Sequence, residues 1–245
     1  ALALPALAST ITVPRLGAAQ AGGGTFRIAM SANLRTLDPA KTSTGEEYIY
    51  NVLVFNGLTR MREDLVVEPE LAESWQFSDD LKTWTFKLRR GVRFHHGREM
   101  NADDVVATLT RILDPATTSP VRSNFEMIDR MEKPDSSTVV FHLKYGYGGF
   151  ADILTDRQVK ILPHDRLGDI GTAPVGTGPF KFASYTPGDR LVVTRNAEYW
   201  ESGKPRFDQV EMRILPEMTV RIAALQAGDL DCVWDLGPEN IRQLQ

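Results

Sequence analysis

The sequence has one cysteine, Cys232, among its 245 residues. A single thiol excludes an internal disulfide framework and a structural zinc site that relies on several cysteines. Runs of five or more basic residues are also missing, and the formal net charge is −4 with a sequence pI near 5.6. Because nucleic acids are bound by clustered Lys and Arg, we expect no nucleic-acid partner.

Acidic residues are missing from the first 21 residues, a segment that differs from the rest of the chain. It starts with the small, apolar run Ala1 to Leu7 and ends in Ala19-Gln20-Ala21, which has the small-x-small form of a signal-peptidase site. Its apolar part is shorter than the roughly 20 residues of a membrane span. We interpret residues 1–21 as the remnant of an export signal peptide, so we expect the mature protein to be exported. An ordinary Ala-rich N-terminus is the alternative.

The rest of the chain has a globular composition, and the whole sequence is 42% hydrophobic and 9% aromatic. Its length predicts between one and two domains. Apolar periodicity and turn residues predict strands and helices without strict alternation, which indicates a mixed α/β (α+β) fold. The expected strands lie over 25–30, 58–60, 75–77, 84–88, 138–143, 159–162, 180–185, 191–194, 210–214 and 231–234, and the expected helices over 46–54, 101–113 and 217–227, with another beginning at Pro238.

Two segments carry strong local signals. Trp75 and Phe77, and then Trp84 and Phe86, alternate with polar residues on either side of a Ser-Asp-Asp turn. This pattern predicts a hairpin with one buried aromatic face. Asn101 is a good N-cap, and the apolar residues after it recur with a helical period.

The pair His95-His96, close to Asp103 and Asp104, raises the question of a metal site. Adjacent residues in an extended chain point to opposite faces, so both histidines cannot easily bind one ion. We therefore interpret the pair as a solvated turn. The two aspartates lie in the first turn of the expected helix, where negative charge suits the helix dipole without any catalytic role.

The remaining motifs build no catalytic site. His164 is isolated, and the loop from Gly171 to Gly178 lacks the Lys-Ser or Lys-Thr of a phosphate loop. No serine lies in a G-x-S-x-G elbow. Cys232 lies in an apolar run, and we interpret it as a buried structural thiol.

Five segments resemble one known family in the same order along the chain. They are LAESWQFSDDLKTWTFKLRRGVRFHHGREMNADDVVATLTRILDP at 71–115, TLDPAKT at 36–42, PVGTGPFKFASY at 174–185, RNAEYWESGKPRFDQVEMRILPE at 195–217 and ALQAGDLDCVWDL at 224–236. Together they resemble the bacterial extracellular solute-binding proteins of family 5, the dipeptide-, oligopeptide- and nickel-binding components of ABC importers. The resemblance runs from about Gly24 to Gln245.

The resemblance implies a periplasmic-binding-protein-like type II fold, in which two lobes close on a solute. Family members are longer than this chain, so we expect it to be truncated before the second lobe. Residues 22–237 then form most of lobe one, with an inserted hairpin and helix subdomain at about 46–165. Residues 238–245 begin lobe two.

The resemblance also implies eight ligand-binding positions from four segments. The loop after the Leu-Asp-Pro motif supplies Ser43, Thr44 and Gly45, and a side pocket supplies Val121. The loop before Pro163 supplies Arg157 and Gln158, and the crossover out of lobe one supplies Trp234 and Asp235. The acidic residue that holds a peptide's α-amine belongs to lobe two in the oligopeptide binders, outside this sequence.

Simple chemistry agrees with these positions. A loop of Ser, Thr and Gly offers backbone and hydroxyl hydrogen bonds, and an aromatic ring offers flat apolar area. Arg157 suits a solute carboxylate through two parallel bonds, or it is a solvated surface arginine. Trp234 either lines the cleft or packs in the core.

We expect a periplasmic solute-binding protein that delivers a small solute to the permease subunits of an ABC transporter by closure of two lobes. Peptide is the favoured solute; nickel chelates, opines, sugars and haem are the other solutes that the family implies. The resemblance implies no catalysis, no cofactor, no metal and a monomer when full length. The alternatives are a secreted hydrolase of peptides or glycosides that uses Asp103 or Asp156, and a peptide sensor or chaperone on the same scaffold.

Overall fold

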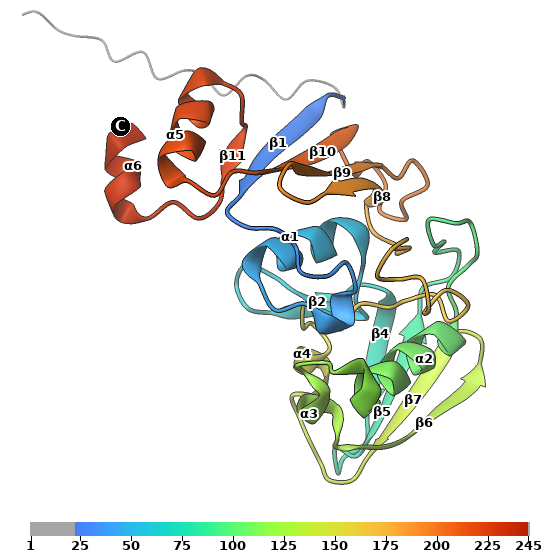
Figure 1. Cartoon of the computed structure of the whole chain (residues 1–245). Coiled ribbons are helices and arrows are strands. Elements are labelled where there is room, and N and C mark those ends of the chain that lie inside the picture. Colours follow the sequence, from blue (N-terminus) through green and yellow to red (C-terminus); the bar gives the residue numbers. More distant parts are fainter. Residues whose placement is uncertain (1–22, 245) are drawn as a thin grey trace, which may run out of the picture.

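The computed structural model describes residues 23–244, so the expected signal peptide at 1–21 lies outside the described residues. The described chain forms two larger apolar cores, one under a five-stranded sheet and one under a four-stranded sheet. Figure 1 shows the two sheets in separate parts of the molecule, with helix α1 between them. We call the core of the five-stranded sheet the first core and the other the second core.

The five-stranded sheet has the order β11-β1-β10-β9-β8. Its strands are β1 (Thr25–Met30), β8 (Phe180–Thr186), β9 (Arg190–Arg195), β10 (Gln209–Ile214) and β11 (Cys232–Val233). Strand β1 is parallel to β10 and β11, whereas β8, β9 and β10 are antiparallel. Alternate residues of β10 are buried, as its apolar alternation predicts.

Three helices accompany this sheet. Helix α1 (Gly45–Val54) packs Tyr50 and Val54 into the first core. Helices α5 (Met218–Ala227) and α6 (Pro238–Leu244) lie beside β11 (Figure 1). Gly228 ends α5 with a φ of 79°, a left-handed conformation that favours glycine. None of the helices within residues 23–244 combines the length and apolar character needed to cross a membrane.

The four-stranded sheet has the order β4-β5-β7-β6 and packs against helix α2. Its elements are β4 (Ala72–Phe77), β5 (Thr83–Leu88), β6 (Ile128–Asp135), β7 (Thr138–Leu143) and α2 (Ala102–Leu113). The hairpin β2 (Thr59–Met61) and β3 (Val67–Pro69), the short helices α3 (Arg122–Phe125) and α4 (Phe150–Ile153), and the 3-10 turns η1 (Pro39–Lys41) and η2 (Pro115–Thr117) complete this part. The predicted subdomain limits of 46–165 stay a prediction.

Most of the expected elements are confirmed, with differences that have physical reasons. Phe77 is 55% exposed, so the aromatic face of the predicted hairpin is buried mainly through Trp84 and Phe86. The expected strand at 159–162 is wrong. Its residues are buried, but their backbone is irregular and is held by single bonds such as the one from Ile161 N–H to the Asn56 carbonyl oxygen at 2.9 Å.

Candidate functional site

The loop before α1 is organised by Glu47, a residue that the sequence reasoning missed. Its carboxylate is fully buried and accepts four backbone N–H groups. Oε2 lies 2.7 Å from the Ser43 nitrogen and 3.0 Å from the Thr44 nitrogen. Oε1 lies 2.9 Å and 3.2 Å from the nitrogens of Arg35 and Thr36. The spacing Thr44-x-x-Glu47 is a capping box, and that signal is readable in the sequence.

This cap changes what the loop can offer a solute. The N–H groups of Ser43 and Thr44 already bond to Glu47, and the Thr44 hydroxyl oxygen accepts from the Glu47 N–H at 3.4 Å. These two N–H groups are therefore used inside the protein, and the contact of the loop with a solute stays a prediction. The Ser43 side chain is exposed, so its hydroxyl is available as a donor on this loop.

The Leu-Asp-Pro motif ties the same loop to the second core. Asp38 is buried and caps η1, accepting the Ala40 N–H at 3.2 Å. Arg111, in the last turn of α2, forms a bidentate ion pair with Asp38. The loop from Lys41 to Gly45 is thus fixed at both ends, by Asp38 and by Glu47.

Trp234 and Gly45 come together although they are far apart in the sequence. A Cβ built on Gly45 would lie 2.4 Å from Cη2 of the Trp234 ring and 3.1 Å from Cζ2, so the ring edge rests on bare backbone. Trp234 is 43% exposed and belongs to none of the apolar cores. Its contact with a solute stays a prediction.

Arg157 lies over Tyr48, with the guanidinium carbon 4.7 Å from the ring centroid. Tyr48 follows Gly45 by three residues on α1, so the two face the same side of the helix. Within the described residues the Arg157 side chain is exposed and has no acidic partner. An open depression of about 440 Å³ is lined by Tyr48, Met61, Thr155, Asp156, Arg157 and Gln158. We call Gly45, Tyr48, Arg157 and Trp234 the α1 surface.

Buried amides hold the Arg157 segment in place. The Asn51 side chain donates to the Arg157 carbonyl oxygen at 3.0 Å. The Gln158 amide is buried and donates to the Thr42 carbonyl oxygen and to the Tyr48 hydroxyl, each at 3.0 Å. The structure therefore places Gln158 behind Tyr48, with its amide donors used inside the protein.

The two other predicted positions lie in different surroundings. Asp235 is half-buried and lies 3.2 Å from a guanidinium nitrogen of Arg221. Val121 precedes α3 and is 7% exposed, packed in the second core. Of the eight predicted residues, the structure directly joins Gly45 with Trp234, and Tyr48 links Arg157 to Gln158.

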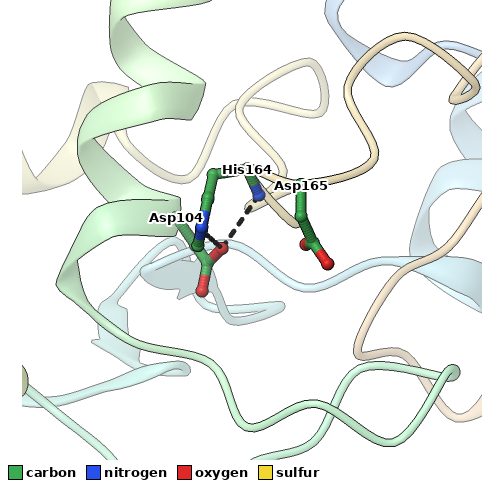
Figure 2. Close-up of side chains that lie close together, drawn as sticks. All are labelled: Asp104, His164 and Asp165. Atoms are coloured by element: carbon green, nitrogen blue, oxygen red, sulfur yellow. Dashed lines mark hydrogen bonds and ion pairs between the residues drawn. The ribbon is translucent and has the colours of Figure 1, made fainter.

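His164 is not isolated, contrary to the sequence interpretation. Figure 2 shows it beside Asp104 and Asp165, whose ligand atoms lie within 4.8 Å of one another. Oδ1 of the buried Asp104 accepts the His164 backbone N–H at 2.9 Å and lies 2.8 Å from its Nδ1. Arg98 donates to Asp104 at 2.6 and 3.1 Å and to Asp165 at 2.8 and 3.1 Å. The Arg98 guanidinium thus supplies the positive charge for both carboxylates. The hydrogen bonds of this cluster hold the start of α2 against the chain after Pro163.

Asp103, a candidate catalytic carboxylate of the hydrolase alternative, forms an exposed ion pair with Lys133. The hydrogen bond from Lys133 lowers the pKa of Asp103, which keeps the group ionised and unsuited to act as an acid. Cys232, expected to be buried, is only half-buried, and desolvation raises the pKa of its thiol.

His95 is also different from the expected solvated turn. Its imidazole lies between two glycines of the loop before β8, with Nδ1 accepting the Gly176 N–H at 3.3 Å and Nε2 3.0 Å from the Gly178 carbonyl oxygen. Burial lowers the pKa of His95 from 6.5 to about 4. The neutral ring, which has one donor and one acceptor, fits this position.

Comparison with known proteins places these features in a family. Residues 66–245 match the family described as bacterial extracellular solute-binding proteins, family 5 Middle. The glutathione-binding protein GsiB of Escherichia coli K12 is 30% identical over 222 residues, which cover 89% of this chain and 43% of GsiB.

Two solved structures share the fold. AgaA from A. tumefaciens R10, in complex with agropinic acid, matches with a TM-score of 0.82 and 34% identity over 86% of this chain and 43% of AgaA. DppA from Helicobacter pylori, in complex with the peptide STSA, matches with a TM-score of 0.85 and 28% identity over 91% of this chain and 49% of DppA.

This chain therefore spans less than half the length of these relatives. Its described part has the mixed α/β fold of a type II periplasmic binding protein, as the sequence pattern and the family resemblance together predict. The relatives are named as binding proteins, which agrees with a role in binding. The chain belongs to the bacterial extracellular solute-binding proteins, family 5.

Proposed function

We propose that this protein captures a small solute, with a peptide as the favoured candidate, on the α1 surface and delivers it to the permease subunits of an ABC importer. Delivery follows closure of a second lobe, and the working form is a periplasmic monomer. The observation that carries the proposal is the α1 surface itself: an exposed Trp234 ring beside Gly45, and an exposed arginine stacked on Tyr48. Membership of the family and the peptide in the related DppA structure support it.

The chemistry of Arg157 supports a solute with a free carboxylate. A planar guanidinium that has no acidic partner can take up a carboxylate through two parallel bonds. The bonds to the Arg157 carbonyl oxygen and to Tyr48 fix the surroundings of this cation before any solute arrives. A site that is ordered in advance loses less entropy on binding.

The other predicted residues act in this proposal as follows. Ser43 offers its hydroxyl, and Thr44 and Gly45 shape the loop under Trp234. Gln158 lies behind Tyr48 and acts on the solute by holding that ring at the edge of the depression. Val121 forms the wall of a side pocket. Asp235 contacts the solute at the crossover out of lobe one, beside Trp234.

The test is titration of the protein with both lobes present, using the peptide Ser-Thr-Ser-Ala and its C-terminal amide. We expect the free acid to bind more tightly, and Arg157→Gln to reduce its affinity by about tenfold, which corresponds to about 1.4 kcal/mol. Arg62→Gln is a matched control, because Arg62 is an exposed arginine that pairs with Asp64. Equal affinity of Arg157→Gln and the unmodified chain for the free acid would count against the carboxylate contact.

The same experiment separates binding from hydrolysis. We expect native mass spectrometry to show intact peptide in the complex, with no cleavage products after long incubation. Cleavage that Asp103→Asn or Asp156→Asn abolishes would replace this proposal with the hydrolase alternative.

A further inference from the structure

Arg221 is a buried arginine near the start of α5, with 3% of its surface exposed. Its Nη1 donates to the carbonyl oxygens of Leu215 and Pro216, each at 2.6 Å. Its Nη2 lies 3.2 Å from Oδ2 of Asp235 and 3.7 Å from Sδ of Met218. One guanidinium therefore joins the end of β10, the start of α5 and the segment after β11.

Asp235 depends on this contact. Among the described residues, Arg221 is the one cation paired with the Asp235 carboxylate. Oδ1 of Asp235 and Nε of Arg221 are both buried and make no hydrogen bond there. The guanidinium edge formed by Nε and Nη2 suits a side-on carboxylate with two bonds, so the pair is held by one bond where two are available.

Trp234, the residue before Asp235, has little else to hold its ring. Trp234 is 43% exposed and lies outside the apolar cores, and its ring rests on Gly45. The segment between β11 and α6 is irregular, and Leu236 adds partial packing against the small core beside β11. The position of the ring therefore follows the position of Asp235.

We propose that Arg221 is a positioning residue of the ligand site: by holding Asp235 it fixes residues 234–237 and seats the Trp234 ring on Gly45. Loss of Arg221 leaves a half-buried carboxylate without a counter-charge, an arrangement that proteins avoid by exposing the charge to water. The segment then moves, and the ring leaves Gly45. The geometric part of the proposal stands on these contacts, whereas its consequence for solute affinity rests on the proposed function.

The test follows Trp234 itself by fluorine NMR of the chain labelled with 5-fluorotryptophan. The chain has four tryptophans, and Trp234→Phe identifies the signal of interest. Arg221→Lys keeps the charge but lacks the planar fork. Asp235→Asn weakens the pair and leaves the two carbonyl bonds of Arg221 in place. We expect both variants to shift or broaden the Trp234 signal while the other three signals stay unchanged.

Arg213→Lys is the matched control, because Arg213 lies on β10 close to Glu211 and makes no ion pair with Asp235. We expect it to leave the Trp234 signal in place. An unmoved Trp234 signal in folded Arg221→Lys and Asp235→Asn protein overturns the proposal. Movement of all four signals also overturns it, since that marks a general structural role. The signals are read without solute, so a peptide that fails to bind counts against the proposed function and leaves this result standing.

Discussion

A side chain at position 45 would collide with Trp234, since a Cβ there would lie 2.4 Å from the ring. Gly45→Ala therefore displaces the exposed ring, although alanine favours a helix by up to about 1 kcal/mol. We expect Gly45→Ala to keep or slightly raise the free energy of unfolding. We expect it to weaken binding of Ser-Thr-Ser-Ala by about 1–3 kcal/mol, the range for loss of an aromatic contact.

A double-mutant cycle checks this assignment. Trp234→Ala removes the ring, so Gly45→Ala in that background has no ring to displace. We expect no additional loss of affinity there, and a melting temperature within a few degrees of the unmodified chain. Equal losses of affinity in both backgrounds would contradict the contact.

His95 makes stability depend on pH. Burial lowers its pKa from 6.5 to about 4, so the unfolded chain takes up a proton at a higher pH than the folded chain. The free energy of unfolding should fall as the pH drops from about 6.5 to about 4 and level off below that, a loss of up to about 3 kcal/mol. We expect His95→Gln to remove this part of the slope in urea titrations at several pH values. His96→Gln should retain the slope, and an unchanged slope in His95→Gln would show that other groups cause it.

At the scale of the element, α1 depends on the buried Glu47 carboxylate for its N-terminus. Glu47→Ala leaves four backbone N–H groups without their acceptor, and each buried orphan costs about 1–3 kcal/mol. We expect a loss of about 3 kcal/mol or more in the free energy of unfolding, measured with urea. Glu47→Gln should be almost as damaging, because its NH₂ group faces two of these donors.

Glu73→Ala is the control, because Glu73 is an exposed residue of β4 with no ion pair among the described residues. A surface change of this kind should stay within about 0.5 kcal/mol. Similar effects of Glu47→Ala and Glu73→Ala would show that the cap contributes little.

The elements that the sequence predicts well are those whose signals are local. The helix after Asn101 is confirmed because its cap and its apolar period agree. The segment at 159–162 reads as a strand because it is apolar, yet burial alone does not supply a neighbouring strand to pair with. Strand β6 is missed because its mostly exposed residues show no alternation.

The candidate site was predictable only in part, for a reason that belongs to the whole molecule. Gly45 and Trp234 are in contact although most of the chain separates them in the sequence, and no local sequence pattern indicates such a contact. The family resemblance supplied both residues. Glu47 was missed although its capping box is local, and Arg221 has no sequence signal because its partners are carbonyl oxygens and a distant carboxylate.

The two larger cores meet at Asn56, which lies between Phe55 of the first core and Leu58 of the second. Its Nδ2 donates to Glu70 at 2.8 Å, and its Oδ1 accepts the Thr177 hydroxyl at 3.1 Å and the Trp200 ring N–H at 3.3 Å. Asn56 is 3% exposed, so these bonds form in a region that water scarcely reaches.

Asn56→Ala leaves the buried partners of this amide without their hydrogen bonds. Each buried polar group that loses its partner costs about 1–3 kcal/mol, so we expect the free energy of unfolding to fall by about 2–4 kcal/mol. Because the amide bridges two separate cores, we also expect the variant to unfold less cooperatively. The measurement is amide hydrogen exchange at increasing denaturant concentration. In the unmodified chain, β5 and β9 should lose protection at the same concentration, whereas in the variant they should lose it at different concentrations. Asn240→Ala, at a half-buried residue of α6 outside the two larger cores, is the control and should keep a single transition. If Asn56→Ala keeps one transition with both strands exchanging together, the cores are coupled by their apolar contacts, and the junction adds stability without linking them.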